Sequence, residues 1–460
     1  MTSLDVTVVN VALPSIGRSF HAQVSGLQWT VDAYTLVLAS VLMLSGSTAD
    51  RVGRRRTFTT GLVVFSAASL LCSLAANLPM LVVFRAVQAL GGSMLAPVAM
   101  SILTNTFTDP RERAQAIGIW GSVNGVSLAL GPVVGGALVS AAGWRAVFWV
   151  NVPVGLAATV LAVRYLPESR AARARRPDLV GQAMLVVLLA AVTYGIIEAP
   201  DAGLSSPLVL AMAGIAVVAI VAFLLYEQRR DEPLLDLRFF RSVPFTAATV
   251  TAVAVFSAMG GFLFMNTLYL QEARGLSALD AGLATLPVAV VATVFSPLSG
   301  RLVGRRGSRV PLVVAGAALI VSMLLLAQMT TNTSYDWLLV AYVVFGTAYG
   351  FANAPITNNA VSGMPREQAG VASAIASMSR QVGSTLGVAV AGAIVASTVA
   401  GHHLGARLAS ATHPAWYALV GCGVVVLAVG FVSTSRWARA TAERTARQLN
   451  PEAISGELIE

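Results

Sequence analysis

The chain has 460 residues, of which 56% are hydrophobic and only 11% are charged. This composition excludes an ordinary soluble domain, in which about a quarter of the residues carry a charge. The formal net charge is +9, and all 30 basic residues are Arg. Most of them fall in polar stretches on one side of the expected membrane topology. That asymmetry is the positive-inside rule and does not indicate a nucleic-acid-binding protein.

Apolar runs of about 20 residues, long enough to cross a bilayer core as a helix, follow one another along the chain. Backbone groups in lipid must be hydrogen-bonded within their own segment, so each run is expected to be helical. We expect the first helix to be truncated, with the native N-terminus upstream of Met1. The runs predict an all-α integral membrane protein with fourteen transmembrane helices, near residues 3–17, 28–48, 57–76, 80–106, 114–141, 145–166, 178–198, 207–226, 244–270, 277–299, 310–329, 336–360, 368–400 and 414–434.

Three short segments recur in the second part of the chain at nearly constant spacing. The pairs are Gly46–Arg56 with Gly300–Arg309, Pro110–Ala114 with Pro365–Ala369, and Leu130–Gly136 with Leu386–Gly392. An internal duplication in a membrane protein predicts a transporter built from two related halves. We therefore divide the chain into an N-terminal six-helix half (1–166), an inserted helix pair with cytoplasmic linkers (167–243), a C-terminal six-helix half (244–435) and a cytoplasmic tail (436–460).

Six motifs stand in order along the chain, namely Leu4–Pro14, Trp29–Tyr34, Gly46–Arg56, Arg85–Gly92, Gly125–Gly136 and Asn151–Gly155. Together they resemble the motifs of the fourteen-span drug:proton antiporters of the major facilitator superfamily, the multidrug and antibiotic efflux type. Thr48 and Ala89 depart from the usual leucine and glycine of that pattern. The resemblance covers essentially the whole chain. It implies the major facilitator fold, with two six-helix halves that rock about a substrate site.

Four ionisable residues inside predicted helices are candidates for proton coupling or substrate binding: Asp5, Asp32, Arg85 and Arg380. A charge at mid-bilayer costs roughly 2.5–3.5 kcal/mol on insertion scales, so each needs a partner or a function. Asp5 is the deepest acid, and Asp32 lies about one turn inside the second helix. The resemblance links Arg85 to proton transfer, and Arg380 could pair with Asp5 across the halves. Each could instead be structural, satisfied by local hydrogen bonds.

The resemblance also implies two conformational motifs. One is a latch between the halves in the outward-facing state, made of Gly46, Asp50, Arg51, Gly53 and Arg54; its arginines could instead only enforce topology. The other is an antiporter motif whose small residues permit close helix approach and whose proline kinks the helix, although generic packing would also explain it. It comprises Gly125, Gly131, Pro132, Gly135 and Gly136. Polar amides in hydrocarbon usually face the bundle interior, which makes cavity-lining candidates of Asn266, Asn353 and Asn358.

These features predict proton-coupled efflux of amphipathic organic compounds across the cytoplasmic membrane, with both termini cytoplasmic. The expected partners are a small-molecule substrate, protons and the bilayer, with no nucleic acid, and the expected state is a monomer. The chain has no phosphate-binding loop for ATP and no group of residues spaced as metal ligands are. We therefore expect that the protein is not an enzyme and that it needs neither a cofactor nor a metal ion. A narrow-specificity metabolite exporter, a symporter on the same scaffold and a transport-dead sensor remain alternatives. The sequence does not set the identity or charge of the substrate.

Overall fold

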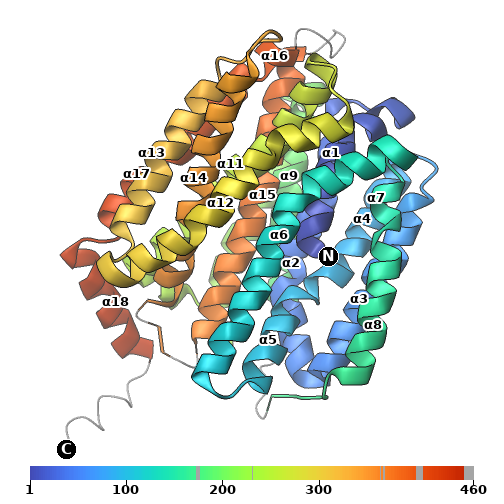
Figure 1. Cartoon of the computed structure of the whole chain (residues 1–460). Helices are drawn as coiled ribbons and strands as arrows, with labels where there is room; N and C mark the ends of the chain where they lie inside the picture. The colour runs from blue at the N-terminus through green and yellow to red at the C-terminus, as the bar shows by residue number, and fades with distance from the viewer. Residues whose placement is uncertain (172–176, 231, 363, 366–367, 400–407, 450–460) are drawn as a thin grey trace, which may run out of the picture.

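The computed structural model describes residues 1–171, 177–230, 232–362, 364–365, 368–399 and 408–449, and these contain helices and no strand (Figure 1). The helices are α1 (Thr2–Phe20), α2 (Val24–Val52), α3 (Arg54–Ser73), α4 (Leu78–Ser93), α5 (Ala96–Thr106), α6 (Pro110–Ala142), α7 (Ala146–Trp149), α8 (Asn151–Tyr165), α9 (Leu179–Ala202), α10 (Pro207–Glu227), the 3₁₀ turn η1 (Leu237–Arg241), α11 (Val243–Leu268), the π turn η2 (Tyr269–Ala273), α12 (Ala278–Arg306), α13 (Arg309–Leu326), α14 (Tyr335–Val361), α15 (Ala369–Val399), α16 (Leu408–Ala411), α17 (His413–Val432) and α18 (Arg436–Leu449).

Among the described residues, 13 stretches of helix are long and apolar enough to cross a membrane, which confirms an all-α integral membrane protein. The first of the expected fourteen spans is α1, and it is not among these 13. Asp5, Thr7 and Asn10 make α1 polar, and all three side chains are buried inside the bundle. Other helices shield α1, so it does not need the apolar surface that faces lipid in a peripheral span.

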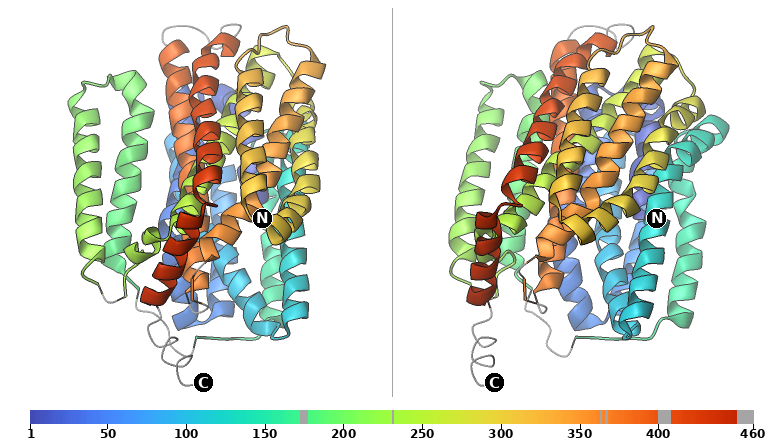
Figure 2. Two further views of the ribbon diagram at one scale, coloured as in Figure 1. Left: turned by 90° about the vertical axis from the view of Figure 1, so that its left-hand side faces the viewer. Right: turned by 60° about the vertical axis from the view of Figure 1, so that its left-hand side comes forward.

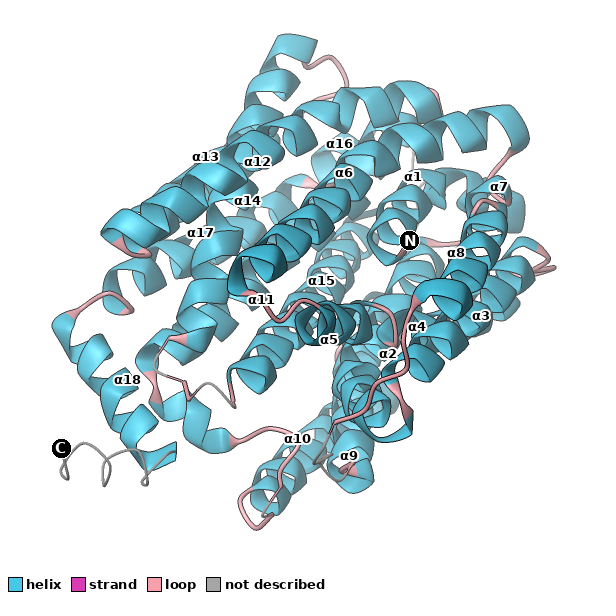
Figure 3. Ribbon diagram, turned by 60° about the horizontal axis from the view of Figure 1, so that its bottom comes forward, coloured by secondary structure: helices cyan, strands magenta, loops and turns pink. Residues whose placement is uncertain are grey.

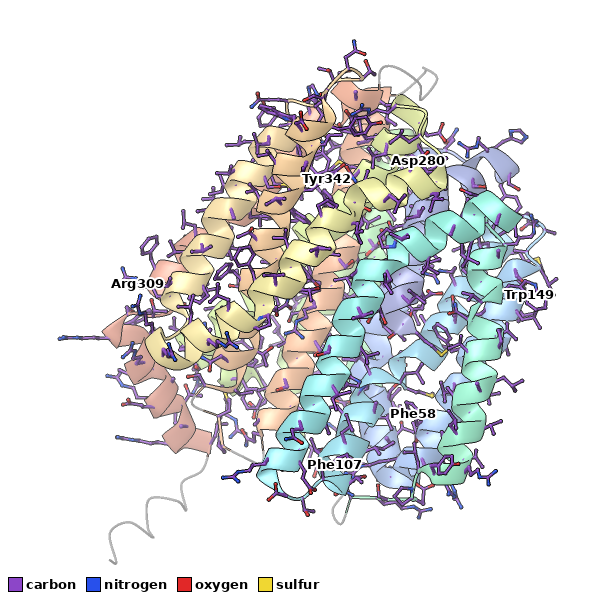
Figure 4. The ribbon with its side chains drawn as sticks, in the orientation of Figure 1. Phe58, Phe107, Trp149, Asp280, Arg309 and Tyr342 are labelled. Atoms are coloured by element: carbon purple, nitrogen blue, oxygen red, sulfur yellow. The ribbon has the colours of Figure 1, made fainter. Side chains whose placement is uncertain are left out.

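The two ends of the bundle differ in charge. The end that carries Arg54, Arg111 and Arg305 is called here the Arg-rich end, and the opposite end, where α1 and α6 finish and α12 begins, the Arg-poor end. Figure 4 labels Phe107 at the Arg-rich end and Asp280 at the Arg-poor end. Successive long helices alternate in direction between these two ends, as expected of a multi-pass membrane protein.

Two helix pairs join the halves: α6 packs on α12, and α2 packs on α15. The α6–α12 contact is tight near the Arg-poor end, where Gly136 lies against the backbone of Ala278 and Gly282 lies against the carbonyl of Pro132. Toward the Arg-rich end the two helices diverge (Figure 1). There, apart from the local backbone of the same helix, no atom of the described residues comes within 4 Å of a Cβ built on Gly118, Gly121, Gly300 or Gly304. The halves are therefore joined at the Arg-poor end.

The inserted pair lies at one side of the bundle (Figure 2). Helix α9 packs on α2 and α15, whereas α10 packs mainly on α9. In the view toward the Arg-rich end, α9 and α10 lie side by side at the edge of the molecule (Figure 3). The expected tail (436–460) includes α18, whose Ala438 and Ala442 are buried and which contacts α11 and η1.

Candidate functional site

Asp5 and Arg85 form a buried ion pair between α1 and α4. The distance from Arg85 Nη1 to Asp5 Oδ2 is 2.5 Å, and the side chains of Arg85 and Asp5 are 1% and 0% exposed, respectively. The guanidinium also lies over the ring of Tyr34, with 4.2 Å from its Cζ to the ring centroid. An ion pair inside a membrane protein is tolerated when each charge compensates the other and the remaining polar atoms are hydrogen-bonded. Asp5 and Arg85 meet the first of these conditions.

Neutral amides meet the second condition. Asp5 Oδ1 accepts hydrogen bonds from Gln88 Nε2 and from Asn151 Nδ2, each at 2.9 Å. Arg85 donates to Gln88 Oε1 at 2.6 Å and to the carbonyl of Thr30 at 3.2 Å. Both carboxylate oxygens of Asp5 are thus satisfied. Sequence reasoning placed Gln88 and Asn151 in motifs but gave neither a role; each is a polar amide in an apolar run, the signal that singled out Asn266.

Asp32, unlike Asp5, has few hydrogen-bond partners. Its side chain is fully buried, Thr35 Oγ1 donates a long 3.4 Å hydrogen bond to Oδ1, and Oδ2 has no hydrogen-bond partner among the described residues. Gln28, Asp32 and Thr35 lie at helical spacing on one face of α2. That face meets α15: Gln28 Nε2 donates to the carbonyl of Ala389 at 2.8 Å, and Thr385 Oγ1 donates to Thr35 Oγ1 at 2.8 Å. Asp32 is an unpaired acid at the contact between the halves.

Arg380 does not pair with Asp5, so that expectation was wrong. Asp5 is held by Arg85 inside the N-terminal half, whereas Arg380 Nη2 donates to Thr357 Oγ1 at 2.9 Å inside the C-terminal half. Similar depth in the membrane does not make two residues neighbours, because helices at the same depth can point in different directions. The guanidinium of Arg380 lies 5.9 Å from the ring centroid of Phe256.

The expected latch residues contact their own half in this conformation. Arg54 Nη2 lies 2.9 Å from Asp50 Oδ1, four residues earlier and across the turn at Gly53. Glu168, which sequence reasoning did not single out, accepts a hydrogen bond from the backbone N–H of Arg55 at 3.1 Å and lies 3.7 Å from Nε of Arg56. The described contacts thus tie the turn between α2 and α3 to the segment after α8. Arg51 is exposed, Gly53 sits at the turn itself, and nothing lies within 4 Å of a Cβ on Gly46.

The expected antiporter motif packs α6 on two neighbours. Gly131 and Gly135 lie against Thr7 and Val8 of α1, where a Cβ would overlap Thr7 Oγ1 and would stand 2.9 Å from Val8 Cα. Gly136, and the carbonyl of Pro132, face α12 of the other half. Gly125 has open space beside it. Four of the five residues therefore make close helix contacts, and two of these contacts cross between the halves.

The three amides expected to line a cavity have partners in the C-terminal half. Asn266 Oδ1 accepts a 2.6 Å hydrogen bond from the hydroxyl of Tyr342, and both residues are buried. Asn358 Nδ2 donates to Ser308 Oγ at 3.2 Å, near the start of α13. Asn353 Nδ2 bonds only one turn back on its own helix, to the carbonyl of Tyr349 at 3.2 Å. Of the three, Asn353 shares a face of α14 with Thr357, the partner of Arg380.

The family model and the related proteins that match this chain agree on one family. The sequence model described as Major Facilitator Superfamily matches residues 1–388. The chain is 38% identical over 397 residues to the multidrug resistance protein Stp of Mycobacterium tuberculosis (strain CDC 1551 / Oshkosh), covering 86% of this chain and 74% of that protein. It is 38% identical to the tetracenomycin C resistance and export protein of Streptomyces glaucescens, covering 87% of this chain and 74% of that protein.

A third relative is the methylenomycin A resistance protein of Bacillus subtilis (strain 168), 34% identical over 94% of this chain and 89% of that protein. Among solved structures, a bacterial homologue of the human lysosomal transporter Spinster, in an inward-facing and unoccupied conformation, superposes with a TM-score of 0.64. It covers 97% of this chain and 94% of that chain at 18% identity, which is evidence for the fold alone.

Proposed function

This chain belongs to the major facilitator superfamily, and we propose that it exports amphipathic organic compounds, drugs or antibiotics, in exchange for protons. The relatives named for resistance and export support efflux. We further propose that the Arg-rich end faces the cytoplasm, as the positive-inside rule requires, so that both termini are cytoplasmic. The membrane is then the cytoplasmic membrane, and no cofactor is needed.

With that orientation, the α6–α12 and α2–α15 contacts close the site on the outer side. Transport then proceeds by alternating access: the halves separate at the Arg-poor end and approach each other at the Arg-rich end. The packing of Gly136 on Ala278 supports this proposal, because a backbone contact of this kind forms in one state and is absent in the other. The turn at Asp50 and Arg54 would act as the latch in the outward-facing state, where the Arg-rich ends of the halves meet.

The unpaired Asp32 carries the proposed proton coupling. Asp5 already has a cation and two amide donors, whereas Asp32 has one long hydrogen bond and lies at the contact that rocking would open. A proton bound to Asp32 would remove its charge while the outer side is closed. Opening at the Arg-poor end would expose the same carboxyl to outside water, where it could exchange its proton. The Asp5–Arg85 pair would hold α1 and α4 in place beside it.

The proton gradient is large enough for this work. A charge moved across the membrane is worth about 2.3 kcal/mol per 100 mV. Each pH unit adds about 1.4 kcal/mol. A proton therefore supplies roughly 3–4 kcal/mol, which supports a gradient of a few hundredfold for a neutral substrate.

The test is drug uptake into inverted vesicles that carry the full chain, with and without a protonophore. Asp32→Asn keeps the shape of the side chain and removes the titratable group, and Asp336→Asn changes an exposed acid at the start of α14 as the matched control. We expect Asp32→Asn to abolish protonophore-sensitive uptake while Asp336→Asn keeps it. Uptake by Asp32→Asn that still collapses with protonophore would show that another group couples the proton. Substrate uptake into cells that accelerates with external acid would instead favour a symporter.

A further inference from the structure

Arg380 is a cation inside a span for which the described residues provide no carboxylate partner. Its Nη2 donates to the neutral hydroxyl of Thr357, and its buried Nε has no acceptor among the described residues. Arg85, the other deeply placed guanidinium, has a carboxylate at 2.5 Å. Within the part of the chain that the structure describes, one intramembrane Arg is thus neutralised by an acid and the other is not.

Asp32 is not the missing partner. The hydrogen bond from Thr385 to Thr35 places these two residues of α15 and α2 at the same depth along the bundle. Asp32 lies three residues from that level toward the Arg-poor end, and Arg380 lies five residues from it toward the Arg-rich end. At 1.5 Å per residue the two charges are separated by about 12 Å along the helices. A carboxyl can also lose its charge by binding a proton, whereas a guanidinium keeps its charge at any physiological pH.

The surroundings of Arg380 suit an aromatic anion. Phe256 lies beneath the guanidinium, and its ring meets the ring of Tyr349 edge to face at 5.6 Å. Tyr349, Asn353 and Thr357 follow at four-residue spacing on α14, so they share one face of that helix. Thr357 is exposed, and its hydroxyl accepts from Arg380 while it donates to the carbonyl of Asn353 at 3.2 Å. Guanidinium forks bind carboxylates through two parallel hydrogen bonds, and aromatic walls bind flat rings.

Resting on the export function proposed above, we propose that Arg380 and Thr357, with Phe256 and Tyr349, form a subsite for the anionic group of an aromatic substrate, a carboxylate or another ring-bound oxyanion. The substrate supplies the negative charge that the protein lacks at this position. Export of such a compound then needs Arg380, whereas export of a cation of similar size does not.

The first test supplies that charge from the protein. Thr357→Asp places a carboxylate beside the guanidinium, and Thr357→Asn has the same size without the charge. The measurement is thermal unfolding of the purified full chain with salicylate or its neutral amide, salicylamide, at millimolar concentration. We expect salicylate to raise the Tm of the wild type and of Thr357→Asn, salicylamide to leave both unchanged, and Thr357→Asp to lose the salicylate response. An equal response in Thr357→Asp, or none in the wild type, would overturn the subsite.

The second test follows radiolabelled salicylate and the cation ethidium in inverted vesicles. We expect Thr357→Asp and Arg380→Gln to lower the ratio of salicylate uptake to ethidium uptake at least about tenfold, the scale of a lost charged hydrogen bond. Arg380→Lys should retain part of the salicylate uptake. Ethidium uptake without salicylate uptake in the wild type, or equal loss of both compounds in the variants, would overturn the subsite and leave the export function standing. Uptake of neither compound by the wild type would overturn the export function, and the Tm response would then decide the subsite alone.

Discussion

Arg18 and Glu272 are joined by an ion pair of 2.6 Å across the two halves, and they are 254 residues apart. The same spacing relates Gly46 to Gly300 in the internal repeat. The two residues therefore occupy equivalent positions of the internal repeat, at the ends of α1 and of the π turn that follows α11, and they meet at the Arg-poor end. Separation of the halves at this end would break the pair.

Arg18→Glu places two like charges at this contact and should favour the open Arg-poor end. The side chains are 61% and 24% exposed, so the pair is worth about 0.2–1 kcal/mol and the shift in population should be roughly 1.4- to 5-fold. The measurement is the rate of drug uptake in inverted vesicles at low and high salt. The swapped double variant Arg18→Glu/Glu272→Arg should regain the wild-type rate. If the double variant kept the altered uptake rate of the single one, the ion pair would have no part in the cycle.

Two glycines of one helix, Gly136 and Gly125, should respond differently to substitution by alanine: only the first substitution should lower stability. A Cβ on Gly136 meets the carbonyl of Ala278, and backbone cannot move aside as a flexible side chain can. We expect Gly136→Ala to lower stability by about 1–3 kcal/mol through overpacking of the closed contact. Gly125 has nothing within 4 Å, so Gly125→Ala should be neutral or should stabilise the helix by up to about 1 kcal/mol.

The measurement for both glycines is thermal unfolding of the purified protein, with Gly121→Ala as a second open-space control. A fall in Tm for Gly136→Ala with no fall for the other two would place the cost at the α6–α12 contact. Equal effects at all three positions would mean that helix propensity alone decides the outcome.

The helices were predictable from the sequence because apolar runs and backbone hydrogen bonding leave few choices in lipid. The breaks within runs were not: the spans near 80–106 and 145–166 are divided into α4 with α5 and α7 with α8. Average hydrophobicity over a run does not change at Met94 and Leu95, or at Val150, where the helix is interrupted although φ and ψ stay in the right-handed α region. The position of a break depends on contacts with neighbouring helices, and the sequence alone does not give those contacts.

The site was predictable in part. Asp5, Asp32 and Arg85 stood out as charges in hydrocarbon, and all three are buried. Their partners were not predictable, because position along the chain gives the depth of a residue and not the neighbour it faces. For this reason the expected pairing of Arg380 with Asp5 across the halves was wrong: Arg380 instead donates to Thr357 in its own half. Glu168 lies outside the spans, and only tertiary contact brings it to the turn at Gly53.

Removing one member of the buried ion pair should cost more than removing both. Arg85→Gln leaves the carboxylate of Asp5 buried without a cation, which typically costs about 3–5 kcal/mol. In Arg85→Gln/Asp5→Asn no charge remains, and Gln88 and Asn151 can still hydrogen-bond to the new amide. We expect the double variant to unfold at a higher temperature than Arg85→Gln alone, measured on purified protein. A double variant no more stable than the single one would show that the charges contribute little beyond their packing.

Gly53 and Glu168 give the last prediction. Gly53 has φ of 127°, a backbone conformation that costs a side chain strain, and a Cβ there would stand 2.6 Å from Glu168 Oε1. Gly53→Ala therefore has two penalties, strain of about 1–3 kcal/mol and a clash with the carboxylate. Gly46→Ala, in the same motif but inside α2 with open space beside it, serves as the control and should leave the Tm unchanged or raise it slightly.

The two penalties at Gly53 can be separated. Glu168→Ala removes the clash but also frees the backbone N–H of Arg55 and the side chain of Arg56, so alone it should lower the Tm. In Gly53→Ala/Glu168→Ala the clash is absent and the strain remains. We expect the loss in Tm of the double variant to be smaller than the sum of the two single losses. Additive losses would mean that the alanine at position 53 never meets the carboxylate, and that strain accounts for the whole requirement for glycine at this turn.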